Sequence, residues 1–171
     1  MRGFVPKSNS PEKDLVMTPT WLALDIMTHF DIQGSYLDPC KGEGAFYNCY
    51  ESENKDYCEL SEGIDFLDYQ GKADWIVTNP PWSKMRQFLV KGMEVADNVV
   101  YLTTINHYTT KRRMSDIRKM GFGVKEIFCV PTPPKPWAAL GFQLGAVHLQ
   151  KGYLGDTKIT WHQDTPIIGG S

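Results

Sequence analysis

Apolar residues recur along the chain at two spacings, every second position in some segments and every third or fourth in others. Short apolar runs rich in β-branched and aromatic residues, which favour strands, occupy residues 36–38, 56–60, 73–78, 98–104, 124–130 and 141–152. Segments with helical spacing occupy residues 18–30, 83–97 and 111–120, and a further helix is expected to begin around residue 43. A short edge strand is expected at residues 158–162.

The order of these elements predicts the class of fold. Strands alternate with helices through most of the chain, which is typical of an α/β domain with a mostly parallel sheet. The strands at 124–130 and 141–152 are joined without a helix, so we expect them to form an antiparallel pair. We expect a flexible arm at residues 1–14, which are polar and contain two prolines, and a single domain over residues 15–171.

The first predicted helix begins with a start signal. Thr18 is the expected N-cap, and Pro19 suits the first helical turn because its missing N–H is not needed there. The positions that repeat at helical spacing are mostly apolar and form the expected inner face: Trp21, Leu22, Asp25, Ile26, His29 and Phe30.

Composition and charge narrow the class of protein. Of the 171 residues, 42% are hydrophobic and 22% charged, and the net charge is -2, so any contact with nucleic acid must come from a local basic patch. No apolar run approaches the ~20 residues of a membrane span. The four cysteines, at 40, 49, 58 and 129, form no closely spaced pair, and the N-terminus does not resemble a signal peptide. We therefore expect reduced thiols, a cytoplasmic protein and no bound metal.

The segment LDPCKGEGAF, residues 37–46, predicts a ligand site, because open α/β sheets bind ligands beyond the carboxyl ends of their strands. Gly42 and Gly44 allow a tight turn and close approach of a ligand to the backbone. The helix expected after them offers free N–H groups and the positive end of its dipole. Asp38, at the strand end, is suited to hold an ammonium group. Two glycines also occur in strand-to-helix turns that bind nothing, so both interpretations remain for this segment alone.

Two acidic positions downstream extend this hypothesis. Glu59 ends the second strand, 17 residues after Gly42, where a carboxylate can accept hydrogen bonds from both hydroxyls of a ribose. At Asp65 and Phe66, a carboxylate can take an adenine amino proton while the ring packs on the purine. Taken singly, Glu59 is equally a surface acid and Asp65 a turn cap, but their order suits a nucleoside cofactor. Tyr47 stands where a dinucleotide fingerprint needs a small residue, which favours an amino-acid nucleoside.

The third predicted strand, 73–78, runs directly into Asn79-Pro80-Pro81-Trp82. Neither proline can donate a backbone hydrogen bond, so the ladder ends here and the chain direction is fixed. The side chain of Asn79, the carbonyl of Pro80 and the ring of Trp82 are therefore held in a rigid arrangement that suits a flat polar group. A rigid loop that only closes the strand is the alternative.

The segments LDPCKGEGAF, CEL, GIDFLDY and NPPW, in that order, resemble those of S-adenosylmethionine-dependent amino-methyltransferases, and most of all the small, phage-type N6-adenine DNA methyltransferases. VMTPTWLALDIMTHF resembles the Thr-Pro helix that precedes the glycine motif in one class of them. The resemblance spans roughly residues 15–150. It implies a Rossmann-like class I methyltransferase fold, with helices on both faces of a seven-stranded, mostly parallel sheet whose last strand is antiparallel.

The same resemblance implies S-adenosylmethionine as cofactor, S-adenosylhomocysteine as product and no metal. The cofactor-binding residues that it implies are Thr18, Pro19, Asp38, Pro39, Gly42, Gly44, Phe46, Glu59, Asp65, Phe66 and Asn79. Asn79 Oδ1 and the Pro80 carbonyl would each accept one N–H of the adenine amine, so that its lone pair points at the methyl donor. Pro80 and Pro81 would keep that carbonyl in place, and Trp82 would stack on a base extruded from the duplex. No ionised general base is needed.

Substrate contacts must come from short segments, because the chain has no room for the separate target-recognition domain of larger DNA methyltransferases. The candidates are basic segments, namely the arm with Arg2 and Lys7, and NHYTTKRRMSDIRK at residues 106–119. The residues expected to contact nucleic acid are Lys111, Arg112, Arg113 and Tyr108, with His107 beside it, and Lys135 and Trp137 in the stiff loop PTPPKPW. A solvated helix face and a core position for Trp137 are the competing interpretations.

The expected activity is methylation of adenine N6 in DNA. Similar enzymes methylate purine amines in RNA or the amide of a protein glutamine, and these substrates stay open because all present a planar, conjugated NH2. Asn79 argues against cytosine enzymes, which more often carry Ser there. A catalytically silent S-adenosylmethionine-binding subunit is a further alternative, although it would have no chemical reason to keep Asn79 and the aromatic ring together. A homodimer would let a lone domain hold a duplex.

Overall fold

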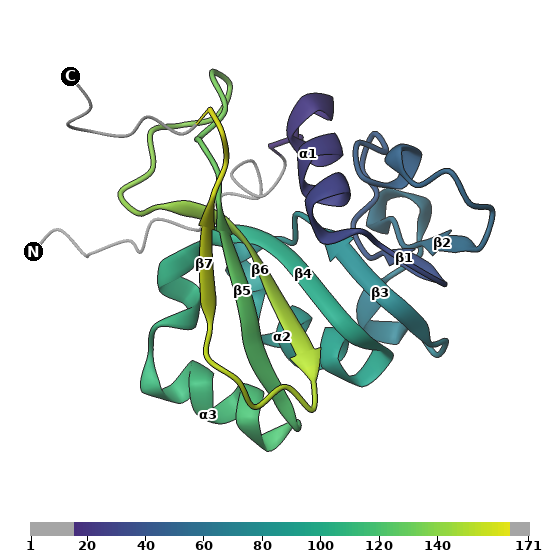
Figure 1. Cartoon of the computed structure of the whole chain (residues 1–171). Helices are drawn as coiled ribbons and strands as arrows, with labels where there is room; N and C mark the ends of the chain where they lie inside the picture. Colours follow the sequence, from purple (N-terminus) through teal and green to yellow (C-terminus); the bar gives the residue numbers. More distant parts are fainter. Residues whose placement is uncertain (1–15, 165–171) are drawn as a thin grey trace, which may run out of the picture.

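The computed structural model describes residues 16–164, which fold around one seven-stranded sheet (Figure 1). The expected arm at residues 1–14, with Arg2 and Lys7, lies outside the described residues. The strands are β1 (Tyr36–Asp38), β2 (Lys55–Tyr57), β3 (Ala73–Thr78), β4 (Ala96–Thr104), β5 (Phe122–Cys129), β6 (Leu144–Lys151) and β7 (Lys158–Trp161). Their order across the sheet is β2-β1-β3-β4-β6-β5-β7.

The directions of the strands confirm the predicted class of fold. β2, β1, β3 and β4 are parallel neighbours, and β6 runs antiparallel between β4 and β5, as the missing helix before it predicts. The antiparallel strand is thus β6, and the short β7 pairs in parallel with β5 at the edge. The parallel strands place their carboxyl ends at one edge of the sheet, where a ligand site is expected.

Helices cover both faces of this sheet (Figure 1). α1 (Thr20–Phe30) lies on one face, and α2 (Met85–Val95) and α3 (Lys111–Lys119) lie on the other. Alternate residues of a strand point to opposite faces, so Ile76 of β3 belongs to the buried cluster beneath α2, and Val77 to the cluster beneath α1. Within the described residues, no helix is both long and apolar enough to cross a membrane.

The start of α1 differs from the prediction. Pro19 is the N-cap instead of Thr18, and its carbonyl accepts hydrogen bonds from the N–H groups of residues 22 and 23, each at 3.1 Å. Pro19 has an extended ψ of 143°, so the helix begins one residue later and Thr18 is too far away to cap it. The buried face of α1 also differs from the predicted one. Trp21 is 42% exposed, and the buried residues are Leu22, Ala23, Ile26 and Met27.

The helix expected near residue 43 is absent from the described segment after β1. Turns continue through residues 39–46, and a single 3-10 turn, Tyr47–Cys49, follows. Gly42 and Gly44 adopt positive φ angles of 54° and 90°, which interrupt a right-handed helix. The Tyr, Asn and Cys that follow are weak helix formers. The site therefore has a glycine turn but lacks the expected positive end of a long helix.

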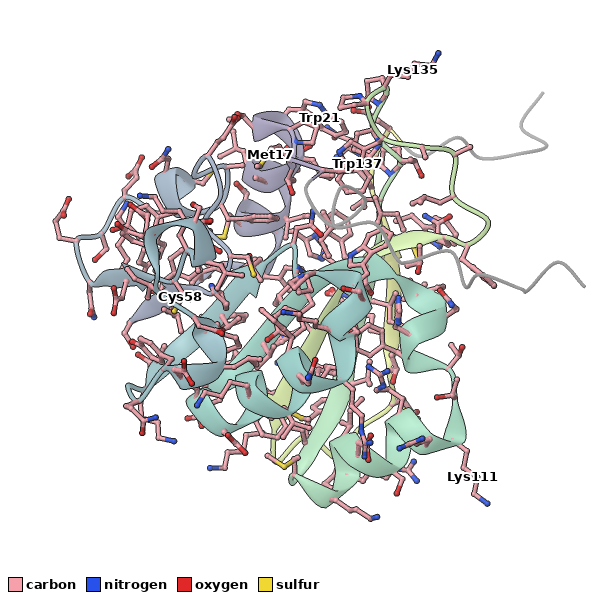
Figure 2. The ribbon with its side chains drawn as sticks, turned by 180° about the vertical axis from the view of Figure 1, so that it is seen from behind. Met17, Trp21, Cys58, Lys111, Lys135 and Trp137 are labelled. Carbon is pink, nitrogen blue, oxygen red and sulfur yellow. The ribbon has the colours of Figure 1, made fainter. Side chains whose placement is uncertain are left out.

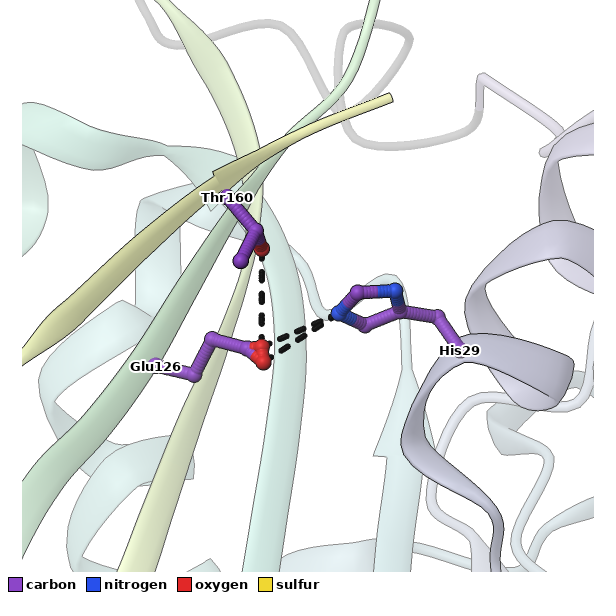
Figure 3. Close-up of polar contacts among 3 residues, drawn as sticks. All are labelled: His29, Glu126 and Thr160. Carbon is purple, nitrogen blue, oxygen red and sulfur yellow. Dashed lines mark hydrogen bonds and ion pairs between the residues drawn. The ribbon is translucent and has the colours of Figure 1, made fainter. Parts of the chain in front are cut away.

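Two histidine–carboxylate contacts fasten α1 to strands that are distant in the sequence. His29 Nε2 lies 3.0 Å from Glu126 Oε2 on β5, and Thr160 Oγ1 on β7 donates to the same oxygen at 3.4 Å (Figure 3). One turn earlier on α1, Asp25 Oδ2 lies 2.7 Å from Nε2 of His162, just past β7. Because α1 begins directly after residues 16–19, these contacts also fix one wall of the site described next.

Candidate functional site

A cavity of about 690 Å³ opens at the carboxyl ends of β1, β2 and β3. Open α/β sheets bind ligands in this position, and small-molecule sites typically measure roughly 300–1,000 Å³. Most of the residues predicted to bind the cofactor or to act in methyl transfer line it: Thr18, Pro39, Gly42, Gly44, Phe46, Glu59, Asp65, Phe66, Asn79 and Pro81. Segments that are far apart in the sequence thus meet around one cavity.

Some predicted residues do not line the cavity, and some residues that line it were not predicted. Four predicted residues lie beside the cavity without lining it: Pro19, Asp38, Pro80 and Trp82. The wall also contains apolar residues of the quoted segments that were not predicted as site residues: Val16, Met17, Leu60 and Ile64. Each of these lies within two positions of a polar motif residue, which was the only signal available in the sequence.

The glycine turn presents bare backbone to the cavity. A Cβ on Gly44, which has φ 90°, would lie 2.7 Å from Asn48 Nδ2, so another residue would require rearrangement. A Cβ on Gly42 would lie 3.1 Å from the sulfur of Met17. The thioether of Met17 therefore lies against the turn, and both residues line the cavity.

Glu59 fixes this turn from a position two residues past the end of β2, rather than from the last residue of the strand as expected. Its Oε2 accepts from Gly42 N at 2.7 Å, and its Oε1 accepts from the N–H and the hydroxyl of Ser61, at 3.1 and 2.7 Å. Partial burial acts to raise the pKa of Glu59, but these hydrogen bonds and the charge of Lys41 hold it below its usual value. A carboxylate has about four acceptor positions. Glu59 is thus ionised and retains room for about one ligand hydroxyl, where two were expected.

Asp65 and Phe66 form a second part of the wall. Asp65 Oδ1 accepts from Leu67 N at 2.9 Å, which caps the short turn Phe66–Asp68 and holds the carboxylate at the cavity. Phe66 is buried and packs against Phe88 of α2, with ring centroids 5.3 Å apart. Asp65 therefore caps a turn and lines the cavity at once, so the two interpretations of this residue are compatible.

Asp38 adjoins the wall without lining the cavity. It is fully buried at the end of β1, where Oδ1 accepts from Thr78 Oγ1 at 2.7 Å and from Cys40 N at 3.1 Å. Among the described residues, Oδ2 has no hydrogen-bond partner. Burial raises the pKa of Asp38 to about 7, although hydrogen bonding by the Thr78 hydroxyl and by the backbone of Cys40 and Tyr47 acts in the opposite direction. A buried carboxylate oxygen without a partner is uncommon and costs free energy. A cationic group of a ligand bound nearby would reduce that cost.

The Asn-Pro-Pro-Trp loop brings Asn79 to the cavity directly after β3. Asn79 Nδ2 donates to the carbonyl oxygen of Val16 at 3.3 Å. Because an amide oxygen would be repelled by that carbonyl, Asn79 Oδ1 points away from it and is available as an acceptor. Pro80 is buried and Pro81 lines the wall. The loop therefore arranges a neutral acceptor at the cavity, as the motif predicts.

Trp82 is half-buried, and its ring is fixed beside this loop. Its Nε1 donates to the carbonyl of Leu102 at 3.0 Å. Trp137 packs edge-to-face against it, with ring centroids 6.2 Å apart, and the ring of His107 lies 6.5 Å away. Trp137 is itself buried and donates Nε1 to the carbonyl of Met17 at 3.0 Å. The ring of Trp137 is thus buried in the core, as one of the two interpretations predicts. The residue also contacts Met17 and Trp82, which lie at the site.

The residues selected for nucleic-acid contact do not form one surface. Lys111 and Arg112 are exposed at the start of α3, whereas Lys135 lies at the opposite end of the molecule, on the side of Trp137 (Figure 2). Tyr108 is only 3% exposed, with the half-buried Arg113 close by. The Tyr108 ring is therefore not available to lie against a base, contrary to the expectation.

The cysteines are four free thiols. Burial raises the pKa of each above the usual value, which keeps the thiols protonated. Within residues 16–164, no group of three His, Cys, Asp or Glu side chains is placed to hold a metal. The even spacing of Cys40, Cys49 and Cys58 in the sequence therefore does not correspond to a ligand cluster.

Solved structures share the fold of this chain. A protein from Pyrococcus horikoshii proposed to be an RNA methyltransferase superposes with a TM-score of 0.57 and 17% identity, over 77% of this chain and 81% of that one. A proposed class I S-adenosylmethionine-dependent methyltransferase from Listeria monocytogenes gives 0.62 and 13%, over 85% of this chain and 65% of that one. The M protein of the type I restriction enzyme EcoKI gives 0.59 and 14%, over 81% of this chain and 44% of that one.

These likenesses establish the fold as the Rossmann-like fold of class I methyltransferases. The chain spans less than half of the EcoKI M protein. No protein-family model and no curated protein sequence matches the chain.

Proposed function

We propose that this protein transfers a methyl group from S-adenosylmethionine to the exocyclic N6 amine of adenine in DNA. The observation that carries the proposal is the position of Asn79. Its side chain lines the same cavity as the glycine turn and Glu59, and its amide nitrogen is engaged by the carbonyl of Val16. The amide oxygen is therefore presented as a neutral acceptor in a cavity whose other walls suit a nucleoside.

The walls suit S-adenosylmethionine in shape and charge. Gly42 and Gly44 permit close approach to the backbone, the ionised Glu59 can accept from a hydroxyl, and the apolar side chain of Phe66 suits a purine. Asp38, next to the wall, has an oxygen without a partner, and a nearby cation would favour its ionised form. Bound S-adenosylmethionine supplies an electrophilic methyl group on a positively charged sulfur.

The residues of the Asn-Pro-Pro-Trp loop act on the methyl acceptor. The amine of adenine is a weak nucleophile because its lone pair is delocalised into the ring. Asn79 Oδ1 and the carbonyl of Pro80 each accept one N–H, which turns the lone pair toward the donor and stabilises the positive charge that develops on nitrogen. Pro81 restricts the loop, so the acceptors are arranged before the substrate binds. The fixed ring of Trp82 provides a stacking surface for a base taken out of its helix.

Other planar NH2 groups would suit the same acceptors. The structural relatives include a restriction-enzyme M protein and a protein proposed to be an RNA methyltransferase. DNA and RNA are therefore both candidate substrates. We place DNA first because the order of the motifs, from the glycine turn to Asn79, resembles that of the adenine DNA methyltransferases.

The test is the transfer of radiolabelled methyl groups from S-adenosylmethionine to unmethylated duplex DNA, single-stranded DNA, total RNA and cell protein in parallel. Each labelled product is digested and its modified nucleoside or amino acid identified. Label in N6-methyladenine from DNA supports the proposal. Label in RNA or in glutamine would keep the role of Asn79 and replace the substrate. Cofactor binding without transfer to any acceptor would favour a silent subunit.

A further inference from the structure

We infer that Trp137 is a positioning residue for Asn79, and that it acts through the backbone of residues 16–17. The inference rests on the proposed function, because it gives a purpose to the orientation of the Asn79 amide. Trp137 Nε1 donates to the carbonyl of Met17 at 3.0 Å, and the adjacent carbonyl of Val16 accepts from Asn79 Nδ2 at 3.3 Å. Side chains from the loops after β3 and β5 thus hold two neighbouring carbonyls of one short segment.

The orientation of the Asn79 amide decides whether it can act on an amine. The two ends of a carboxamide have nearly the same shape and opposite roles, since the oxygen accepts and the NH2 donates. Rotation about the terminal side-chain bond exchanges them at little steric cost. The carbonyl of Val16 allows only the NH2 end to face it. Without that carbonyl, Asn79 would also present donors to the substrate amine, which needs acceptors.

Trp137 keeps the carbonyl of Val16 in place by holding the adjacent carbonyl of Met17. Residues 16–19 belong to no helix or strand, so no ladder of backbone hydrogen bonds holds them. Trp137 is only 7% exposed, and its ring is fixed by edge-to-face packing on Trp82. Its N–H therefore provides a rigid attachment for the carbonyl of Met17. Trp137 thus links the segment to Trp82 of the Asn-Pro-Pro-Trp loop.

The variant W137F removes this N–H and retains an aromatic ring. We expect a fall in kcat of about fivefold to tenfold, as for the loss of one hydrogen bond, with a smaller change in the KM for S-adenosylmethionine. We also expect faster solvent exchange of the Asn79 side-chain NH2 protons, measured by NMR. The NH2 of Asn98 donates to the carbonyl of Asp74, also at 3.3 Å, and serves as the internal reference. A general loss of stability would change both amides alike.

The matched control is W75F. Trp75 packs against the same buried cluster, stacks on His148 at 4.9 Å and does not line the cavity. It should leave kcat and Asn79 exchange unchanged. If the wild type transfers methyl groups and W137F equals it in kcat and in Asn79 exchange, the inference is overturned while the proposed function stands.

Two further outcomes separate the inference from the proposed function. If the wild type methylates nothing, the proposed function fails, but the effect of Trp137 on Asn79 can still be tested. Faster exchange of the Asn79 NH2 protons in W137F would then support the inference, and unchanged exchange would overturn it. If W137F does not fold, hydrogen exchange in the wild-type protein provides the test. The indole proton of Trp137 should exchange far more slowly than that of Trp161, which is 60% exposed. Equal rates would overturn the inference.

Discussion

Thr78 donates its hydroxyl hydrogen to Asp38 at 2.7 Å, and both side chains are fully buried. Asp38 is the last residue of β1, directly before the segment with the glycine turn, and Thr78 is the last residue of β3, directly before Asn79. One hydrogen bond therefore joins the two parts of the site that we assign to the cofactor and to the methyl acceptor. The ionisation of Asp38 is accordingly a property of the whole site.

The substitution Asn79→Ala removes the proposed acceptor for the substrate amine. We expect methyl transfer to fall by about 100-fold or more, which is typical when one group that stabilises transition-state charge is removed. Binding of S-adenosylhomocysteine, measured by calorimetry, should change little, because the glycine turn and Glu59 are untouched. Unchanged turnover in this variant would rule out the proposed role.

The substitution Asp38→Asn should alter the dependence of stability on pH. The folded-state pKa of about 7 lies above the usual value of 3.8, so the folded protein keeps a proton that the unfolded chain releases. Stability is therefore lost as the pH rises from about 4 to about 7. Urea denaturation across this range should show that the variant lacks this loss. A variant with the same pH profile as the wild type would mean that burial does not hold the proton on Asp38.

The substitution His148→Phe should have the opposite effect. Burial, assisted by the charge of Lys125, lowers the pKa of His148 to about 4 from the usual 6.5, so the unfolded chain binds a proton that the folded protein does not. Stability is thus lost as the pH falls from about 6.5 to about 4. Removing this titration should leave the variant relatively more stable in acid. Asn98 Oδ1, which loses its contact with His148, still accepts from Gln150.

The two titrations oppose each other in the wild type, so their contributions to its stability should largely cancel between about pH 4 and 6.5. The single variants should diverge from it in opposite directions over that range. Parallel profiles for all three proteins would contradict both assignments.

Much of this fold could be predicted because its strands are short, apolar and separated by clear breaks. The predicted bounds of β1 and β3 agree with those observed. The missing helix after β1 could not be foreseen, because Gly42 is compatible with a helix start and only the observed positive φ values exclude one. The burial of Tyr108 could not be predicted either, because it follows from how the turn Ile105–Tyr108 packs in the folded protein.

The candidate site was predicted better on its polar side than on its apolar side. Asn79 follows β3 directly and Glu59 lies two residues after β2, and the carboxyl ends of neighbouring parallel strands meet at one edge. Val16 and Met17 reach the same cavity from the start of α1, a helix that contacts β5 through His29 and the residue after β7 through Asp25. No local pattern encodes that long-range contact.

The substitution Gly92→Ala tests the packing of α2 against β4. A Cβ on Gly92 would lie 2.5 Å from Tyr101 Oη and 3.2 Å from Val99 Cγ1. Tyr101 cannot swing away easily, because its hydroxyl donates to the carbonyl of Phe88 at 2.7 Å. We expect a loss of about 1–3 kcal/mol from overpacking, despite a helix-propensity gain of at most about 1 kcal/mol. The measurement is the free energy of unfolding in urea.

The control for this substitution is Gly141→Ala, where a Cβ would meet no atom within 4 Å. It should change the free energy of unfolding by no more than about 0.5 kcal/mol. Equal effects of the two substitutions would show that α2 can move away from Tyr101.

The contacts of His29 with Glu126 and of Asp25 with His162 have a consequence for biosynthesis. α1 is translated before these partners, since Glu126 lies 97 positions after His29 and His162 lies 137 positions after Asp25. Contacts at such separations close slowly and leave apolar surface exposed in the meantime. The contacts of α1 with Glu126 and His162 can therefore form only after those residues have left the exit tunnel, whereas its packing against β1 and β3 can form earlier.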